Sequence, residues 1–144
     1  MNKKQHGFAF VELLLVLVIT ILLGSLALSY GEKGMKNQEI NHFFDQLVND
    51  SLLIQKYALN NQTKTAIEFN FKLHTYTAKI VSSDKKLFVR DMPKSMKLNK
   101  NSTVNRIAFN ENGNASYVGK IIYDYIGGNR ALYVYLGSGR VAVK

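Results

Sequence analysis

The feature that most constrains this chain is a long apolar run close to its start. From Phe8 to Leu28 there are 21 residues, and Glu12 is the only charged residue among them. At the rise of an α-helix, such a run extends roughly 31 Å, which is about the thickness of the hydrocarbon core of a bilayer. The run therefore predicts a helix that crosses a membrane. Because a carboxylate in such a helix is costly, Glu12 requires a partner charge.

The residues around the start of the run form a recognisable arrangement. A short basic leader with Lys3 and Lys4 ends at Gly7, Phe8 follows, and Glu12 is the fifth residue after Gly7. This arrangement resembles the processing site of type IV pilins and pseudopilins. The resemblance implies that a prepilin peptidase cuts between Gly7 and Phe8 and methylates the new amino terminus. It also implies that Glu12 neutralises the terminal amine of Phe8 on a neighbouring subunit when the helices stack into a filament.

An ordinary secretory signal is the alternative interpretation of this start. Ala27-Leu28-Ser29 would then supply the small-residue cleavage site. The apolar part of a secretory signal usually covers about 7–15 residues, so this run is longer, and Glu12 interrupts its beginning. In either case Lys3 and Lys4 favour a cytoplasmic amino terminus, with the rest of the chain outside.

With 144 residues, the chain has room for one small globular domain after the long helix. We expect a leader over 1–7, a transmembrane part of the helix over 8–30, an amphipathic part over 31–61, and a β domain over 62–144. There is no cysteine, so no disulfide supports this domain. A sheet of this size needs a further element to cover one of its faces.

The second part of the predicted helix supplies that cover. Apolar residues recur there at the i, i+3, i+4 spacing, which gathers them in one stripe, while Asp45, Asn49 and Asp50 lie mostly off it. Such a stripe predicts packing on the rest of the chain in preference to a cofactor site. The stripe includes Ile40, Phe43, Phe44, Leu47, Val48, Ser51, Leu52, Ile54, Tyr57 and Ala58.

From Thr65 onward the apolar period changes to two, which is typical of half-buried strands. Short turns rich in glycine and asparagine separate the strands, so we expect an antiparallel meander of roughly four to six strands. The polar and basic stretch 94–103 is interpreted as a loop. The predicted fold class is therefore α+β, with one long helix packed on a carboxy-terminal antiparallel sheet.

The end of the chain adds to the resemblance. The segment Leu132–Val141 is similar to the closing strands of minor pseudopilins of competence systems and of the type II secretion H-subunit and FimT group. In those proteins the final hairpin ends in glycine, arginine and valine, which are Gly139, Arg140 and Val141 here. The absence of the paired cysteines found in many major pilins favours a minor subunit.

No arrangement of residues in the sequence indicates catalysis. His42 and His74 stand apart from other candidate ligands or bases, and the glycine pairs do not open a helix after a strand. We therefore predict that the protein is not an enzyme and that it holds no cofactor and no metal.

Basic residues indicate contact with anionic partners. The formal net charge is +9, which favours surfaces such as nucleic acid, anionic polymers or lipid headgroups. Lys94, Lys97, Lys100 and Arg106 lie in or beside the predicted loop, where they could contact DNA phosphates. The alternative is a loop whose charges only keep the subunit soluble.

Tyrosines form a second candidate surface. Within 122–126 and 132–136 the tyrosines alternate with aliphatic residues, so we expect them to share one face of the sheet. Such a face could bind a neighbouring subunit or stack bases, or its rings could simply pair across strands. The residues are Tyr117, Tyr123, Tyr125, Tyr133 and Tyr135.

Together, these features predict a minor pilin or pseudopilin of a competence-type IV pilus involved in DNA uptake. Its partners would be other major and minor pilin subunits, prepilin peptidase, the cell membrane and DNA. The amino terminus would be cytoplasmic and the globular domain extracellular. Two alternatives remain, a minor pseudopilin of type II secretion and a membrane-anchored extracellular DNA-binding module.

Overall fold

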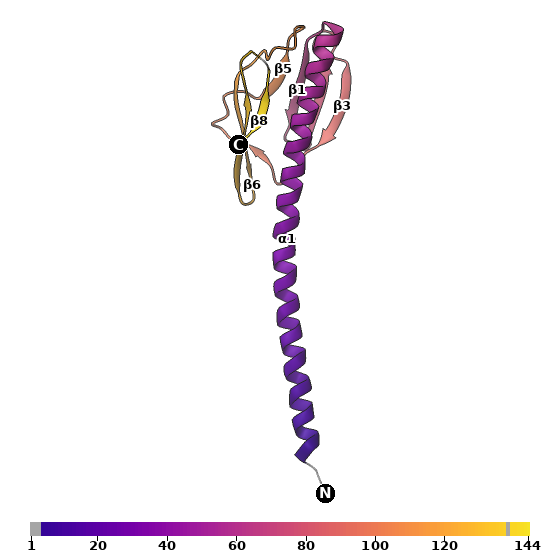
Figure 1. The fold of residues 1–144 in the computed structure, drawn as a ribbon, viewed down its shortest axis with the longest axis vertical. Helices are drawn as coiled ribbons and strands as arrows, with labels where there is room; N and C mark the ends of the chain where they lie inside the picture. The colour runs from indigo at the N-terminus through magenta and orange to yellow at the C-terminus, as the bar shows by residue number, and fades with distance from the viewer. Residues whose placement is uncertain (1–3, 138) are drawn as a thin grey trace. The chain divides into compact units, whose positions relative to one another are not determined.

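The computed structural model describes the backbone of residues 4–137 and 139–144, and the side chains of 10–25, 37–137 and 139–144. The chain divides into two compact units, Met1–Glu39 and Ile40–Lys144. One helix, α1 (Lys4–Asn61), contributes to both units, which are described separately below (Figure 1).

In the first unit, the described side chains of α1 are exposed and mostly apolar. Examples are Phe10, Leu13 and Leu23, each of which is more than half exposed. Among the described residues, no helical stretch is both long enough and apolar enough to cross a membrane. The predicted apolar run, 8–28, extends beyond the side chains that are described there, 10–25.

The second unit contains two antiparallel sheets. Sheet A has the strand order β3-β2-β1-β5, and sheet B has the order β4-β6-β7-β8. The strands of sheet A are β1 (Thr65–Asn70), β2 (Thr75–Ile80), β3 (Lys86–Asp91) and β5 (Arg106–Phe109). Those of sheet B are β4 (Lys97–Leu98), β6 (Gly119–Tyr125), β7 (Gly128–Val134) and β8 (Val141–Val143). The α+β fold class, with a long helix and antiparallel strands, is thus confirmed. The prediction that the strands form a single meander is wrong, because they form two sheets.

The residues between β3 and β5 explain why there are two sheets. The chain leaves sheet A after β3, adds β4 to sheet B, and returns so that β5 pairs with β1. Met92 and Met96 are buried along this path. The stretch 94–103 is therefore not a simple loop, because it contains β4 and Met96. Isolated methionines in a polar stretch give no periodic signal, which is why the pattern failed there.

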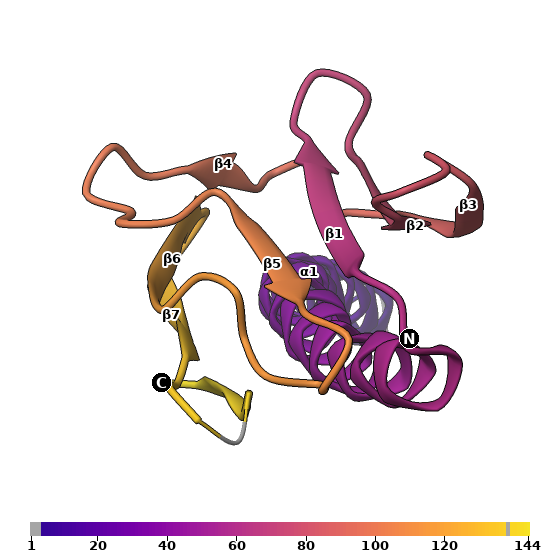
Figure 2. The ribbon, with the colours of Figure 1, turned by 90° about the horizontal axis from the view of Figure 1, so that it is seen from above.

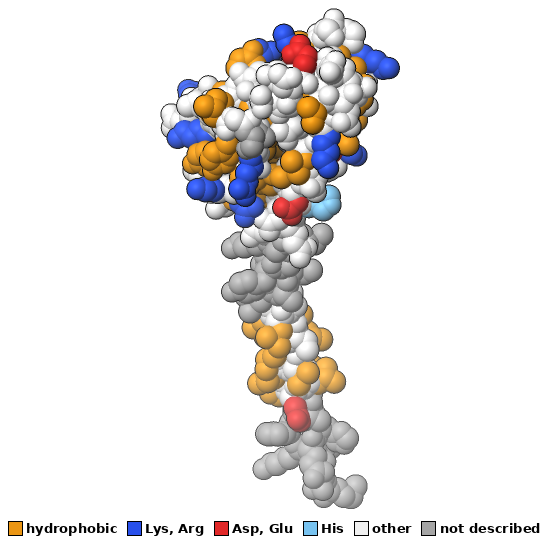
Figure 3. Space-filling model, turned by 45° about the horizontal axis from the view of Figure 1, so that its top comes forward, with side chains coloured by type: hydrophobic (Ala, Val, Ile, Leu, Met, Phe, Trp, Pro, Cys, Tyr) orange, Lys and Arg blue, Asp and Glu red, His pale blue; other side chains and the backbone are white. Residues whose placement is uncertain are grey.

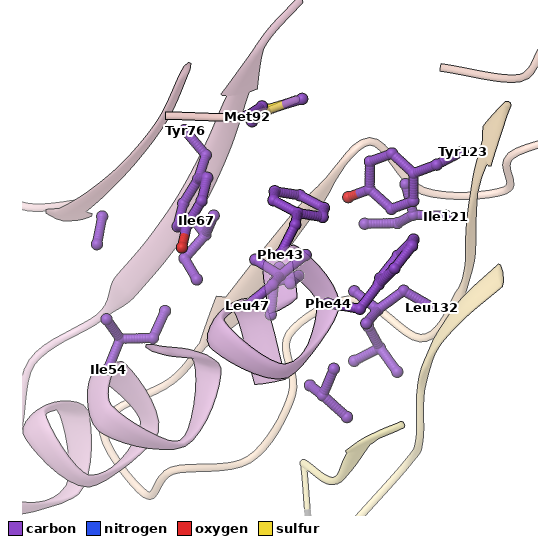
Figure 4. Packing of buried hydrophobic residues seen from close by; sticks show 14 of the residues in the cluster. Phe43, Phe44, Leu47, Ile54, Ile67, Tyr76, Met92, Ile121, Tyr123 and Leu132 are labelled. Atoms are coloured by element: carbon purple, nitrogen blue, oxygen red, sulfur yellow. The ribbon is translucent and has the colours of Figure 1, made fainter. Parts of the chain in front are cut away.

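Residues 40–58 of α1 pack against both sheets (Figure 2). Phe43 and Phe44 are neighbours on the helix and therefore point in different directions. The Phe43 ring lies 6.0 Å from that of Tyr76 in sheet A, and the Phe44 ring lies 5.6 Å from that of Tyr123 in sheet B (Figure 4). One helix can cover two sheets because its apolar stripe is wide enough to face both.

Candidate assembly and nucleic-acid surfaces

The predicted processing site lies at the start of α1. The surroundings of Gly7 and of the Phe8 side chain lie outside the described residues, whereas those of Glu12 are described. Glu12 is exposed on the helix between Val11 and Leu13, which are themselves more than half exposed. In Figure 3, hydrophobic side chains follow an acidic one along this helix, in the direction of the second unit's domain. A carboxylate in these surroundings can be paired only by a group from another molecule or from the part of the chain not described.

Two of the predicted basic residues line the same groove. Lys94 and Lys97 lie beside Asp124, Tyr125 and Ile126, around a groove of about 370 Å³. The Asp124 carboxylate accepts hydrogen bonds of 2.8 and 2.9 Å from the Asn99 side-chain amide. The charge of this groove is therefore mixed.

The other two basic residues lie elsewhere. Lys100 is exposed in the segment after β4. Arg106 belongs to β5 in sheet A, where its guanidinium lies 4.5 Å from the centre of the Tyr117 ring and donates a hydrogen bond to the Tyr117 hydroxyl. The structure thus brings Lys94 and Lys97 together in one groove, and Arg106 is not among the residues that line it.

A buried polar network was missed by the sequence analysis. Asp50, expected off the apolar stripe, is only 5% exposed. Its carboxylate accepts a hydrogen bond of 2.6 Å from the Tyr76 hydroxyl, and Arg90 Nε lies 3.3 Å from the same oxygen. Burial, together with the hydrogen bond to Asp50, raises the pKa of Tyr76 well above its ordinary value. No sequence signal indicated this network, because its members are far apart in the chain and belong to three elements.

The tyrosines do not share one face, so this expectation was wrong. Tyr123 is fully buried, and Tyr125 packs against the same core. On the adjacent strand β7, Leu132 and Val134 are buried, and Tyr133 between them points to the opposite side of the sheet. The alternation was correct within each strand, but the register pairs Tyr123 with Arg130 and not with a tyrosine. The pairing register cannot be read from alternation alone.

The two histidines singled out in the sequence lie on different elements. His42 is exposed on α1, and His74 lies in the turn between β1 and β2, where its backbone carbonyl accepts a hydrogen bond from the Met92 amide. Within the described part of the chain, no group of three or more histidine, aspartate or glutamate side chains could hold a metal ion.

The fold is similar to that of solved structures. The structure matches crystal structures of the type IV minor pilin FimU of Pseudomonas aeruginosa, with TM-scores of 0.55 and 0.54 at 15% sequence identity. The match covers 69% of this chain and 84% or 88% of the FimU chain. The chain therefore has the fold of a type IV pilin.

The sequence comparison is more specific. The chain is 29% identical over 148 aligned positions to the competence protein ComGD of Bacillus subtilis, covering 99% of this chain and 95% of ComGD. No protein-family model matches the chain. The similarity to ComGD and the pilin fold together support the type IV pilin and pseudopilin family.

Proposed function

We propose that this protein is a minor pilin or pseudopilin, a structural subunit of a competence-type IV pilus that takes part in DNA uptake. The observation that carries the proposal is the similarity to the competence protein ComGD along nearly the entire chain. The pilin fold supports it independently. The work of such a subunit is mechanical, so no catalytic step is assigned to it.

The proposal includes processing of the amino terminus and anchoring in the membrane. A prepilin peptidase removes residues 1–7 and methylates Phe8, and residues 8–30 hold the subunit in the membrane with its amino terminus in the cytoplasm. The exposed apolar side chains of 10–25 support this role, because burial among other helices would remove a large apolar area from water. The domain after α1 is then presented outside the cell to other major and minor pilin subunits.

Glu12 is proposed as the residue that guides assembly. In apolar surroundings an unpaired carboxylate costs about 2.5–3.5 kcal/mol at the centre of a membrane helix, and less near the interface. The new amino terminus of a processed subunit carries the opposite charge. Pairing Glu12 with the Phe8 amine of a neighbour relieves both costs, so the filament is favoured over the separate subunits.

A charge substitution at Glu12 tests this proposal in cells that assemble the pilus. Glu12→Gln keeps the size of the side chain and removes its charge, whereas Glu12→Asp keeps the charge. We expect Gln to lower the fraction of subunit in sheared filaments at least about tenfold, which corresponds to about 1.4 kcal/mol, while cleavage at Gly7 continues. The matched control is Glu39→Gln, which removes the charge of an exposed carboxylate elsewhere on the same helix. Normal incorporation of Glu12→Gln would refute the assembly role.

The alternative assembly is a type II secretion pseudopilus. Deleting the subunit in its host separates the two, since loss of transformation with normal secretion supports a competence pilus. Loss of protein secretion with normal transformation would support the alternative.

Direct contact with DNA is a second candidate function, favoured by the net charge of +9. The proposed contacts are Lys94, Lys97, Lys100 and Arg106. A triple substitution of the three lysines by glutamine should weaken retention on DNA at low salt. Arg106 is best tested separately, because its contact with Tyr117 also stabilises the local structure.

A further inference from the structure

Sheet B has an outer face whose side chains point away from the core. On β7, Leu132 and Val134 are buried, so Tyr133 lies on the opposite side, and Tyr135, the residue after the strand, stacks against Tyr133. The register places Lys120 of β6 directly opposite Tyr133. Lys144 pairs through its backbone with Ala131, two residues before Tyr133, and therefore lies on this face as well.

The two tyrosines of this outer face form an ordered aromatic pair. Their rings are stacked, with centroids 6.3 Å apart and an angle of 26° between the planes. Tyr135 is 39% exposed, and Tyr133 is partly exposed. Rings held in this way by a strand lose little conformational freedom when a planar ligand stacks on them.

Cations flank the aromatic pair. Lys144 Nζ lies 5.8 Å from the centre of the Tyr133 ring, and Lys120 lies across the strand pair from the same tyrosine. In Figure 3, lysine and arginine side chains lie next to hydrophobic ones on the side where sheet B lies. Among the described residues, the register places one carboxylate on this face, that of Asp124, four residues along β6 from Lys120, and it also places Lys97 of β4 on this face, opposite Asp124. The surroundings of the tyrosines are therefore positive.

We propose that the outer face of sheet B binds single-stranded nucleic acid, with bases stacked on Tyr133 and Tyr135 and phosphates held by Lys120 and Lys144. Stacking aromatics between cations suit a ligand in which flat rings alternate with negative charges. Unpaired bases are required, because a duplex keeps its bases stacked inside and would meet the lysines alone. This inference deepens the DNA-uptake role proposed above and assigns contact to Lys120 and Lys144. Of the lysines at 94, 97 and 100, the register places Lys97 on the same face.

Binding is tested with the full chain in non-ionic detergent, using fluorescence anisotropy of a labelled oligothymidine and of a duplex of the same length. We expect tighter binding of the single strand. Tyr135→Leu should weaken it about fivefold or more, whereas Tyr135→Phe, which keeps the ring, should bind as the parent does. Lys120→Gln and Lys144→Gln should each reduce the slope of log K against log salt concentration by about 0.7.

Three controls keep the result specific. Tyr57→Leu removes a partly exposed tyrosine of α1, outside sheet B, and should leave binding unchanged. Inorganic polyphosphate offers the charges without bases and should compete poorly. Thermal unfolding of each variant checks that the fold persists. If Tyr135→Leu does not fold, Tyr133→Leu tests the stacking in its place.

Equal binding of single strand and duplex, or a Tyr135→Leu variant that binds as the parent does, would overturn the proposal. So would binding lost through the substitution of Lys94 and Lys100 but not of Lys120 and Lys144, which would assign contact to the segments that flank β4. Because the assay contains no filament, its failure leaves the pilin role untouched. Failure of the Glu12 experiment likewise leaves this binding result standing.

Discussion

Gly139 lies where three parts of the second unit meet, and adding a single methyl group there should strongly lower the free energy of unfolding. Its φ is +63°, and it is buried beside β8. A Cβ added here would lie 2.6 Å from Gln55 Nε2, 2.9 Å from the Gly113 carbonyl oxygen and 3.0 Å from Phe109 Cε1. The Gln55 side chain also donates a hydrogen bond of 2.7 Å to that same carbonyl. The methyl group would therefore push apart α1, the turn before β6 and the final hairpin.

The expected loss of stability for Gly139→Ala follows from three contributions. A left-handed backbone costs an L-residue roughly 1–2 kcal/mol. Loss of the hydrogen bond from Gln55 costs about 0.5–1.5 kcal/mol, and overpacking costs typically about 1–3 kcal/mol. Since these contributions are not strictly additive, we expect a decrease of about 3 kcal/mol or more in the free energy of unfolding.

Gly137→Ala provides the matched control. Gly137 also has a positive φ, +83°, but no atom would lie within 4 Å of an added Cβ. It should therefore lose only the backbone contribution of roughly 1–2 kcal/mol. Urea unfolding of the two variants, followed by near-UV circular dichroism, measures the difference. If Gly139→Ala is no less stable than Gly137→Ala, the packing of the final hairpin against Gln55 and Gly113 is wrong.

Three further predictions concern the core. Tyr76→Phe should cost about 1.5–3 kcal/mol in urea unfolding, because it removes a buried hydrogen bond to a carboxylate, and an unchanged midpoint would argue against the network. The folded pKa of Tyr76 is raised above 10.0, so as the pH rises the unfolded chain loses this proton before the folded chain does. The contribution of Tyr76 to the free energy of unfolding should therefore be fully present below pH 10.0 and decrease above it. In Tyr76→Phe the decrease of stability above pH 10.0 should be less steep. Tyr123→Phe should raise stability by about 1 kcal/mol in thermal unfolding, because the Tyr123 hydroxyl is buried without a hydrogen-bond partner among the described residues; a loss of stability would reveal a partner.

The sequence was most informative where a period persists over many residues. The apolar stripe of 40–58 predicted the packing of α1, and the period of two predicted antiparallel strands. Two residues of the helix depart from the prediction. Leu52, assigned to the stripe, is exposed, and Asp50, expected off it, is buried, because its burial depends on Tyr76 and Arg90, which reach it only in the folded chain. Periodicity reports which face of an element is apolar, and it does not report partners supplied from elsewhere.

The candidate surfaces were less predictable than the fold. Alternation placed tyrosines correctly within β6 and within β7, but the two strands present them to opposite sides. Which side faces the core depends on the pairing register and on the helix that covers the sheet, and a shift of one residue reverses it. Likewise, Lys97 of β4 and Arg106 of β5 are close in sequence but belong to different sheets.

The central claim is that a processed amino terminus and Glu12 together convert this chain into a filament subunit. The most direct measurement is the intact mass of the protein recovered from sheared filaments, with fragmentation of its first residues. We predict a chain that begins at Phe8 and carries one methyl group on its amine. A filament-associated chain that retains residues 1–7, or one that begins at Ser29 or Tyr30, would contradict the account.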